Sequence, residues 1–520
     1  MDKVKQNFLF IIADQLRADH VGFGGNSVVQ TPNIDDLAAR ATQFNRAYVA
    51  NPICMPNRAS ILTGRMPSVH GTRFNGIPLD RSAHTFVREL HNNGYHTGHI
   101  GKAHYQNLGD GPSGIVDKLF PVPGDALTSP HPDGWDQFEM HEAHQNAYVE
   151  MPPDYYGFQH TELLTHHSDL CAGHYYHWVK ERGYDLRKLQ GPANAKRRYD
   201  QWQQVYQTAL PEEIYPTRYV ADRSCRYLED MVGSGNPFFL HVSFPDPHHP
   251  FTPPGKYYDM YEPASIDLPA TFYDPHEASM PHYRFMTRRR GKIPKMWVAA
   301  FSPTEDQFRH AAAAEYGMIS LIDHAVGQIL ATLDATGLAE NTIVIFTSDH
   351  GDMFGDHGIM LKGAMHYEGA IRIPLLIARP EQAALQTEGL AGSLDLAQTL
   401  LELAGVPEYH GLQGVSLVPM LDDADVRVRT QVLIEEDEMF DMMLVGHPFR
   451  ARTLITENER LSIYQHIEQG ELFDLSEDPG ELHNAWTDPS RRTNRNDLTE
   501  QLARELMNMA DTSPKPTHMA

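Results

Sequence analysis

Residues 7–15 read Asn-Phe-Leu-Phe-Ile-Ile-Ala-Asp-Gln, an apolar run that ends abruptly in two polar side chains. Such an unbroken run is typical of a strand buried on both faces, whereas a half-exposed strand alternates apolar and polar residues. Doubly buried strands belong to parallel sheets that helices cover on both sides. Asp14 and Gln15 stand where the strand ends, and ligands of open α/β sheets bind at the carboxyl ends of strands. The stretch therefore predicts a central parallel strand that carries site residues.

The rest of the chain alternates strands with helices, which indicates a large, mostly parallel sheet sandwiched by helices. We expect further strands at 44–49, 96–100, 237–244, 342–347 and 374–378. We expect helices at 31–38, 85–92, 218–231, 304–333 and 394–404, of which 304–333 is either one long helix or a kinked pair.

Two segments depart from this pattern. Residues 106–216 are rich in Pro, Gly, His, Tyr and Trp and show little periodicity, so we predict a long insertion with short helices that shapes a pocket. After residue 421 the chain predicts short strands at hairpin spacing and a final helix at 497–509. We therefore divide the chain into a catalytic α/β domain, 1–425, and a small C-terminal α+β subdomain with an antiparallel sheet, 426–520.

Composition excludes several classes of partner. The 520 residues carry 43 Lys and Arg against 68 Asp and Glu, a net charge of −25, which argues against nucleic acid or anionic membrane. The three cysteines are few and odd in number, which argues against a disulfide framework and suits a reducing cytoplasm. The apolar run at 8–13 is too short for a signal peptide or a membrane span, and no other segment qualifies. We therefore expect a cytoplasmic protein with no membrane partner.

The stretch Cys54-Met55-Pro56-Asn57-Arg58 lies between an apolar approach and an expected helix. The free amides and the dipole of a helix N-terminus favour anions. The guanidinium of Arg58, one turn further on, suits sulfate or phosphate oxygens. This predicts an anion-processing site with residue 54 as the nucleophile. A buried structural cysteine beside a surface arginine is the alternative, because single cysteines are often core residues.

Polar residues also follow the other predicted strands. They are Lys102 and His104, His248, Asp349 and His350, and Lys362 in a later turn. Two acids, an amide oxygen and an imidazole can bind a divalent cation. Two lysines, an arginine and two histidines can surround an oxyanion and protonate a leaving group. Singly, an Asp after a strand could be a helix cap, a Gly-Lys pair could be a solvated turn, and His248 could simply pack in its proline-rich loop. Together they fall at one edge of one predicted sheet, and they would make that edge locally positive in a negative protein.

These residues resemble the motifs of the type I sulfatases, which belong to the alkaline phosphatase superfamily. Cys54-x-Pro-x-Arg58, followed by Ala-Ser-Ile-Leu-Thr-Gly-Arg at 59–65, resembles the signature whose cysteine is converted to formylglycine. The resemblance spans nearly the whole chain and continues in Gly101-Lys102-x-His104, Pro247-His248-x-Pro250, Ser348-Asp349-His350-Gly351, the run from Lys362 through Tyr367-Glu368-Gly369 to Arg372-x-Pro374, and 472–481. It implies an alkaline-phosphatase-like fold.

The resemblance also implies a metal centre. Its ligands would be Asp14, Gln15, Asp349 and His350, with residue 54 completing the set. Many arylsulfatases have Asp-Asp and Asp-Asn at the two paired positions, whereas this chain has Asp-Gln and Asp-His. The amide lowers the ligand charge and the imidazole is a softer donor, so manganese becomes an alternative to calcium, the family's usual ion.

The resemblance further implies a role for each remaining residue. Arg58 would hold the formylglycine hydrate, Lys102 and Lys362 would bind the sulfuryl oxygens, His248 would protonate the leaving oxygen, and His104 would act as the base on the hydrate. Asn75 would bind substrate. One hydroxyl of the hydrate attacks sulfur, and deprotonation of the other expels sulfate, so that water need not attack the hindered sulfur again.

The expected activity is therefore hydrolysis of aryl or small alkyl sulfate monoesters, with a small anionic ester as the substrate. The resemblance implies a formylglycine-generating maturation enzyme as a partner. It also implies a homo-oligomer as the assembly. The same Asp-Gln and Asp-His pairs occur in the phosphonate monoester hydrolase branch, so hydrolysis of phosphonate monoesters or phosphodiesters is the alternative. Lys102 and His104 favour the sulfatase, because well-known members of that branch carry Tyr and Thr there. A third reading is a catalytically silent anion-binding protein.

Overall fold

The computed structural model describes residues 5–109, 130–439, 441 and 446–518. Its central strand is β1 (Asn7–Asp14), in which every residue is buried. Phe8, Phe10 and Ile12 pack into one hydrophobic cluster, whereas the side chains that alternate with them pack into another on the opposite face. The predicted doubly buried strand is confirmed.

The main sheet has the strand order β10-β2-β11-β9-β1-β8-β3-β4-β5, and β12 pairs with β2. Its five central strands, β9, β1, β8, β3 and β4, run parallel to one another, and antiparallel pairings appear toward the edges. The strands that accompany β1 are β2 (Thr42–Tyr48), β3 (His96–Lys102), β4 (His160–Thr165), β5 (Ala172–Gly173), β8 (Phe238–Pro247), β9 (Thr342–Ser348), β10 (Arg372–Ile373), β11 (Leu375–Ala378) and β12 (Leu385–Gly392).

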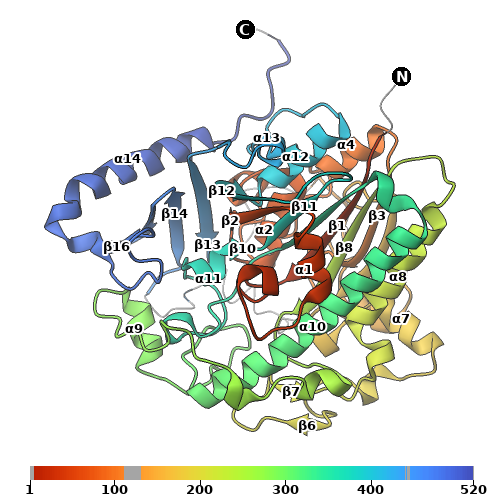
Figure 1. Ribbon diagram of the computed structural model, residues 1–520, viewed down its shortest axis with the longest axis horizontal. Coiled ribbons are helices and arrows are strands. Elements are labelled where there is room, and N and C mark those ends of the chain that lie inside the picture. The colour runs from red at the N-terminus through yellow and green to blue at the C-terminus, as the bar shows by residue number, and fades with distance from the viewer. Residues whose placement is uncertain (1–4, 110–129, 440, 442–445, 519–520) are drawn as a thin grey trace.

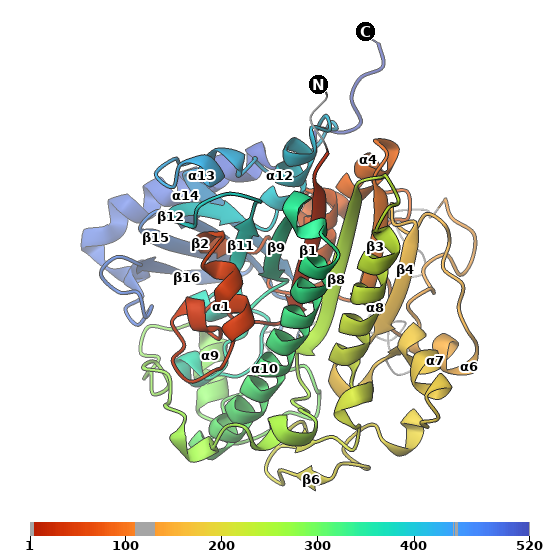
Figure 2. The same ribbon diagram turned by 45° about the vertical axis from the view of Figure 1, so that its right-hand side comes forward.

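Helices cover both faces of this sheet, as the sequence predicts (Figures 1 and 2). One face carries α1 (Pro32–Ala38), α7 (His174–Glu181), α8 (Pro216–Met231) and α10 (Glu305–Ala335). The other carries α2 (Cys54–Thr63), α4 (Phe86–Asn92), α12 (Asp395–Ala404) and α13 (Val418–Asp422), with α3 (Pro67–His70) beside α2. Short helices α6 (His141–Asn146), α9 (Pro281–Thr287) and α11 (Glu368–Ile371) lie in the connections.

The long helix α10 is unbroken, which decides between the two predicted forms. Thr304 accepts a hydrogen bond from the Gln307 amide, and the Gln307 side chain accepts one from the Thr304 amide, a capping box that fixes the start of the helix. No helix among the described residues combines the length and apolar character needed to cross a membrane.

The predicted insertion at 106–216 is more ordered than its sequence suggests. It contains short helices as expected, and residues 110–129 of it lie outside the described residues. It also contains β4, which adds to the main sheet beside β3, and the small ribbon of β6 (Arg197–Arg198) and β7 (Tyr206–Gln207). The sequence did not predict β4, because its apolar residues, Leu163 and Leu164, stand side by side among polar ones.

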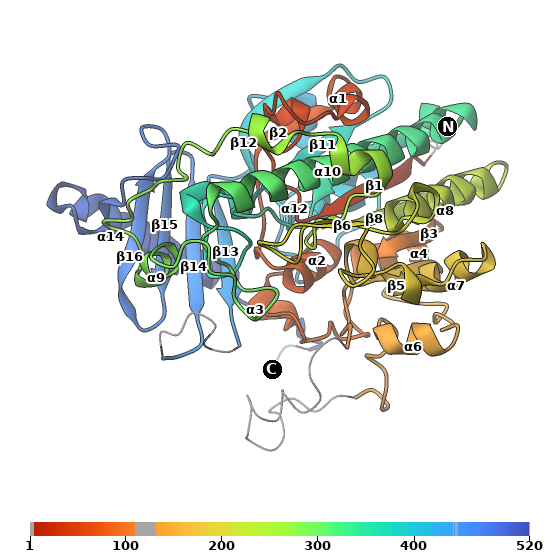
Figure 3. The same ribbon diagram turned by 90° about the horizontal axis from the view of Figure 1, so that it is seen from below.

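The C-terminal sheet is antiparallel, as predicted, and lies beside the main body of the molecule (Figure 3). It consists of β13 (Gln431–Asp437), β14 (Arg450–Thr456), β15 (Glu459–Tyr464) and β16 (Ile467–Asp474). The helix α14 (Arg492–Asn508) packs Leu498 and Leu502 against this sheet. Inside it, the buried Arg460 guanidinium binds the carboxylates of Glu471 and Glu481 at 3.0 and 2.5 Å.

Candidate active site

The predicted site residues converge at one edge of the main sheet. Asp14 and Lys102 end β1 and β3, while His248 and Asp349 directly follow β8 and β9. Because parallel strands present their carboxyl ends on the same edge, these side chains meet there although they are far apart in sequence. Two of the adjoining residues, Gln15 and His104, have φ angles of 63° and 55°, a region that residues other than glycine rarely adopt.

Cys54 is the first residue of α2 and is 1% exposed. Its Sγ lies 3.0 Å from His350 Nε2 and 3.7 Å from Asp14 Oδ1. Burial raises the pKa of the thiol to about 11, despite the nearby Lys362. The side chain is therefore a protonated thiol at neutral pH, and as a cysteine it is a poor nucleophile.

The start of α2 is fixed by two asparagines outside the helix. Asn51 Oδ1 accepts a hydrogen bond from the amide of Ile53, and Asn75 Oδ1 accepts one from the amide of Met55 at 3.1 Å. Asn75 is exposed, so the structure places it at the outer rim of the site, next to Cys54 in space.

Arg58 connects the strands that meet here. Its Nε donates to Asp349 Oδ2 at 2.7 Å, and its Nη1 donates to the Lys102 carbonyl at 3.0 Å and to Ser243 Oγ at 2.9 Å. Its buried Nη2 lies 3.7 Å from Asp14 Oδ2 and has no hydrogen-bond partner among the described residues. Although burial opposes ionisation of Asp349, the Arg58 charge holds the pKa of that carboxyl well below its usual value.

Four of the five residues predicted as metal ligands form one buried cluster. One ligand atom from each of Asp14, Cys54, Asp349 and His350 lies within 4.8 Å of the others. His350 Nδ1 lies 2.8 Å from the carbonyl of Gly351, so Nδ1 carries the proton and Nε2 is free to ligate. Burial lowers the pKa of His350 to about 4, which keeps the imidazole in its neutral, ligating form.

Gln15, the fifth predicted ligand, contacts this cluster through its backbone. Its backbone amide donates to Asp349 Oδ1 at 2.9 Å. Its Nε2 donates to Asp352 Oδ2 at 2.7 Å, which leaves Oε1 directed at Lys362. Two carboxylates, an amide oxygen and a neutral imidazole are ligands that a divalent cation accepts. The residues present therefore fit the predicted metal centre.

Each lysine joins this cluster to a histidine. Lys102 Nζ contacts Asp14 Oδ2 and lies 2.5 Å from His167 Nε2. Lys362 Nζ contacts Gln15 Oε1 and lies 3.0 Å from His248 Nε2. With Arg58, three cations are gathered beside the carboxylates of Asp14, Asp349 and Asp352, so positive charge is concentrated here in a protein of net charge −25. This is the charge arrangement that an anionic substrate requires.

His104 is held in place through its backbone. The amides of residues 104, 105 and 106 all donate to the carboxylate of Glu139, at 2.6 to 3.0 Å. The His104 Nδ1 is buried without a hydrogen-bond partner among the described residues. Burial, together with the charges of Lys102 and Arg58, holds the pKa of the imidazole well below its usual value. A neutral imidazole is competent as a general base.

Three further histidines, His166, His167 and His174, could line the pocket or simply pack, as judged from the sequence. The structure places His174 at the start of α7, where its Nδ1 accepts a hydrogen bond from the amide of Leu163. It places His167 inside the site, against Lys102 and His248. The missing signal was β4: had residues 160–165 been recognised as a parallel strand, His167 would have fallen at the same sheet edge as the other site residues.

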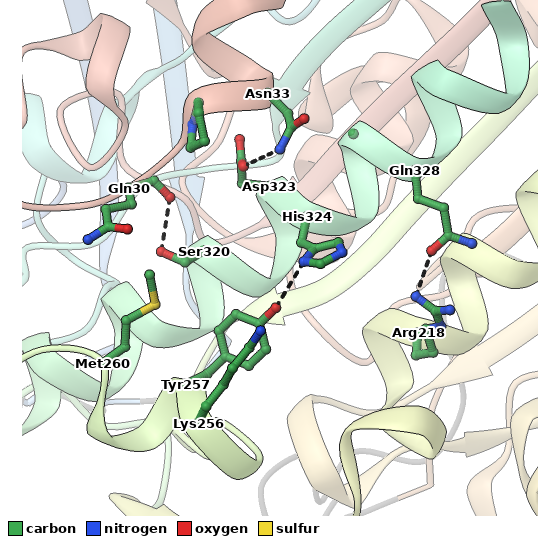
Figure 4. Close-up of a pocket in the computed structure, with 12 residues that line it drawn as sticks. Gln30, Asn33, Arg218, Lys256, Tyr257, Met260, Ser320, Asp323, His324 and Gln328 are labelled. Carbon is green, nitrogen blue, oxygen red and sulfur yellow. Dashed lines mark hydrogen bonds between the residues drawn. The ribbon is translucent and has the colours of Figure 1, made fainter.

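A cavity of about 720 Å³ lies elsewhere, between α1, α8, α10 and the turn Gly255–Asp259 (Figure 4). Its polar side chains pair with one another: Asn33 donates to Asp323 at 2.7 Å, and Arg218 donates to Gln328 at 2.7 Å. It contains none of the strand-end residues, so the converging charges, and not the volume of a cavity, mark the candidate active site.

Comparison with known proteins agrees with this geometry. Residues 6–406 match the family model described as Sulfatase, and residues 355–509 match the one described as N-sulphoglucosamine sulphohydrolase, C-terminal. The chain is 28% identical to an arylsulfatase of Clostridium perfringens, over 97% of this chain and 95% of the relative. It is 28% identical to a choline-sulfatase of Rhizobium meliloti, over 95% and 85% of the two chains.

Among solved structures, the phosphonate monoester hydrolase of Agrobacterium radiobacter superposes with a TM-score of 0.77 at 25% identity, covering 98% of this chain and 97% of that one. Since the Sulfatase model spans most of the sequence, including every residue of the cluster around Cys54, the chain belongs to the sulfatase family.

Proposed function

We propose that this sulfatase hydrolyses sulfate monoesters of aryl or small alkyl alcohols, with residue 54 acting after its oxidation to formylglycine. The observation that carries the proposal is the state of Cys54. Its thiol is buried and protonated at neutral pH, yet it lies at a helix N-terminus among three cations and a set of metal-ligand side chains. These surroundings suit an oxygen nucleophile attacking an anionic ester, which a cysteine does not provide.

Asp14, Gln15, Asp349 and His350 would hold one divalent cation, with calcium as the expected ion and manganese as the alternative. When bound, the cation supplies positive charge that lowers the pKa of a hydroxyl on the formylglycine hydrate, and the hydrate supplies the nucleophilic oxygen. Metal analysis of the purified protein, before and after chelation, identifies the ion and tests whether activity returns with it.

The side chains of the site then divide the remaining work. Lys102 and Lys362 bind and orient the sulfuryl oxygens, and Arg58 holds the formylglycine hydrate, in a water-excluding site where such charges are strong. His248 Nδ1 lies 2.5 Å from the His249 carbonyl, so Nδ1 carries the proton and Nε2 faces the Lys362 ammonium. We assign the protonation of the leaving oxygen to this His248–Lys362 pair. Neutral His104 takes a proton from the hydrate.

The second candidate is hydrolysis of phosphonate monoesters or phosphodiesters. Two observations favour it: the Gln15 and His350 ligand pair, and the similarity to a phosphonate monoester hydrolase over nearly the whole chain. Comparing kcat/KM for matched 4-nitrophenyl sulfate, phosphodiester and phosphonate esters separates the two activities. The first proposal requires the sulfate to be the best of the three.

The decisive test combines mass and activity. In the active preparation, the peptide that contains residue 54 should have the mass expected when CH₂SH becomes CHO. Cys54→Ala should abolish hydrolysis of 4-nitrophenyl sulfate in protein that melts like the wild type. Undiminished hydrolysis by Cys54→Ala would rule out the formylglycine mechanism. An intact cysteine together with bound but unhydrolysed sulfate ester would support the silent anion-binding alternative. Co-expression with a formylglycine-generating enzyme tests the proposed maturation.

A further inference from the structure

The loop that follows β4 brings a histidine into the site to which neither the sequence motifs nor the proposed mechanism gives a role. His167 Nε2 lies 2.5 Å from Lys102 Nζ and 3.9 Å from Asp14 Oδ2. One ring nitrogen of His167, one of His248 and the Sγ of Cys54 all lie within 4.8 Å of one another. Because Lys102 and Lys362 reach the same small space, the group that these side chains surround is an anion and not a second cation.

The His167 ring is also fixed against His248. The two imidazoles stack with their centroids 3.7 Å apart and an interplanar angle of 21°. The neighbouring Ser168 Oγ donates to the carbonyl of His248 at 2.6 Å, which ties the two loops together. These contacts hold His167 in place relative to His248, the side chain assigned to the leaving oxygen.

The backbone around His167 is strained. His166 and Ser168, on either side of it, have φ angles of 70° and 50°, a conformation that residues other than glycine adopt rarely and at a cost. Such strain persists only where the surroundings enforce it, and it concentrates at functional sites.

A buried carboxylate enforces this conformation. Asp169 accepts hydrogen bonds from Tyr206 Oη at 2.6 Å, Thr208 Oγ1 at 2.9 Å and the amide of Gly191 at 3.1 Å. Its own amide donates to Thr252 Oγ1 at 3.3 Å, next to the turn that carries His248. The loop is therefore anchored from two sides, and the result of that anchoring is the position of the His167 ring.

We propose that His167 is a positioning residue: its Nε2 accepts a hydrogen bond from the Lys102 ammonium and so directs that ammonium at a sulfuryl oxygen of the substrate, and its ring supports His248 by stacking. A lysine ammonium has only donors, so the hydrogen bond to His167 fixes the direction of the two N–H groups that remain for a sulfuryl oxygen. This inference rests on the proposed function, since the anion is the sulfuryl group of the ester. The opposing reading is that His167 only packs against His248.

Two substitutions separate these roles. His167→Phe keeps a flat ring for stacking and removes the acceptor of the Lys102 hydrogen bond, whereas His167→Gln keeps an acceptor oxygen and removes the ring. The probe is inorganic sulfate, titrated calorimetrically into each metal-loaded variant, because this measurement needs no turnover. Values of kcat and KM for 4-nitrophenyl sulfate are measured in parallel, and a melting curve verifies that each variant folds. His167→Leu replaces the phenylalanine variant if that variant does not fold.

We expect His167→Phe to bind sulfate roughly tenfold to a hundredfold more weakly than the wild type, the range for one lost hydrogen bond to a charged group. We expect His167→Gln to recover most of that loss and to keep a reduced kcat, because the stack is missing. Wild-type sulfate affinity in His167→Phe, or equal losses in both variants, would overturn the inference. His160→Gln, at the opposite end of β4, is the matched control and should leave both measurements unchanged.

Failure of the proposed function gives a different pattern. If the wild type binds sulfate but does not hydrolyse sulfate esters, the proposed activity is wrong, while the sulfate affinities of the His167 variants still decide the role of this residue.

Discussion

At residue 54 the environment decides which chemistry is open to the side chain. A cysteine nucleophile needs a lowered pKa, and here burial raises the pKa of the thiol to about 11 although Lys362 and Lys102 act in the opposite direction. Arg58 does not activate the thiol either, since its hydrogen bonds go to Asp349, Ser243 and the Lys102 carbonyl. The surroundings therefore suit an oxygen nucleophile at this position better than a thiol.

This environment predicts the reactivity of unmodified protein. Because the thiol pKa lies above its usual value, the thiolate is about one part in a thousand at pH 8 and rises about tenfold per pH unit below pH 11. Iodoacetamide should therefore label Cys54 slowly at pH 8 and progressively faster at pH 9 and 10, as followed by peptide mass spectrometry. The unfolded chain in denaturant should be labelled quickly at pH 8. Fast labelling of the native protein at pH 8 would contradict the burial argument.

The residues at strand ends could be predicted from sequence, and the contacts between them could not. Asp14, Lys102 and Asp349 each follow an apolar run, and parallel strands bring such positions to one edge whatever the details of the fold. That Lys102 contacts both Asp14 and His167 depends on β4, whose polar residues hide it from a pattern search. Loop residues such as His167 are positioned by long-range hydrogen bonds that sequence periodicity does not report.

At the scale of elements, a side chain of α10 caps the first turn of α1. Asp323, in the middle of α10 and 3% exposed, accepts hydrogen bonds from the amide of Ile34 and from the Asn33 side chain at 2.8 and 2.7 Å. The amides in the first turn of a helix lack partners within the helix, so a carboxylate from another element can satisfy them. The sequence predicted both helices and not this link, because the partners are almost 300 residues apart.

Removing this link should loosen the packing of α1 on α10. Asp323→Ala leaves the buried Ile34 amide unpaired, which costs about 1–3 kcal/mol. Differential scanning calorimetry should therefore show a lower melting temperature, with kcat/KM unchanged because the site lies elsewhere. Gln328→Ala, on the same helix and lining the same cavity, is the control and should have the smaller effect. A drop in activity with unaltered melting would point to a role for this cavity that its contacts do not indicate.

At the scale of the whole molecule, the C-terminal sheet helps to build the active site. Asn51 donates from Nδ2 to the Glu435 carbonyl of β13 at 2.6 Å, and its Oδ1 accepts from the amide of Ile53 at the start of α2. On the same strand, Glu436 accepts from the amide of Ala364 at 2.8 Å and lies 2.9 Å from His366 Nε2. One strand of the C-terminal sheet thus holds both the helix that begins at Cys54 and the turn that carries Lys362.

Glu436 should therefore affect catalysis without touching the substrate. Glu436→Gln offers only one acceptor oxygen to its two partners, so the Lys362 turn shifts, and displacements of this kind lower rates by up to about a hundredfold. We expect a clear fall in kcat/KM for 4-nitrophenyl sulfate at a nearly constant melting temperature. Glu500→Gln, exposed on α14, should have no effect. Equal kinetics for the two variants would mean that β13 only packs against the site.

The contrast between a positive site and a negative molecule predicts a salt effect. At low ionic strength the net charge of −25 repels an anionic ester over long distances, while the site cations act only nearby. Raising the salt from 0.01 to 0.1 M shortens the screening length from about 30 to about 10 Å, so kcat/KM for an anionic aryl sulfate should rise. A zwitterionic sulfate ester should respond less. A steep decline with salt would show that local attraction governs the encounter.

The position of Cys54 also implies an order of events in the life of the chain. In the folded protein this residue is 1% exposed beneath the sheet edge, out of reach of any other enzyme. Maturation as proposed must therefore precede the docking of α2. Synthesis proceeds from the N-terminus, so the segment around residue 54 emerges long before β9 supplies Asp349 to hold Arg58. Modification and folding then compete in time, and slowing the folding reaction should raise the fraction of chains that become active.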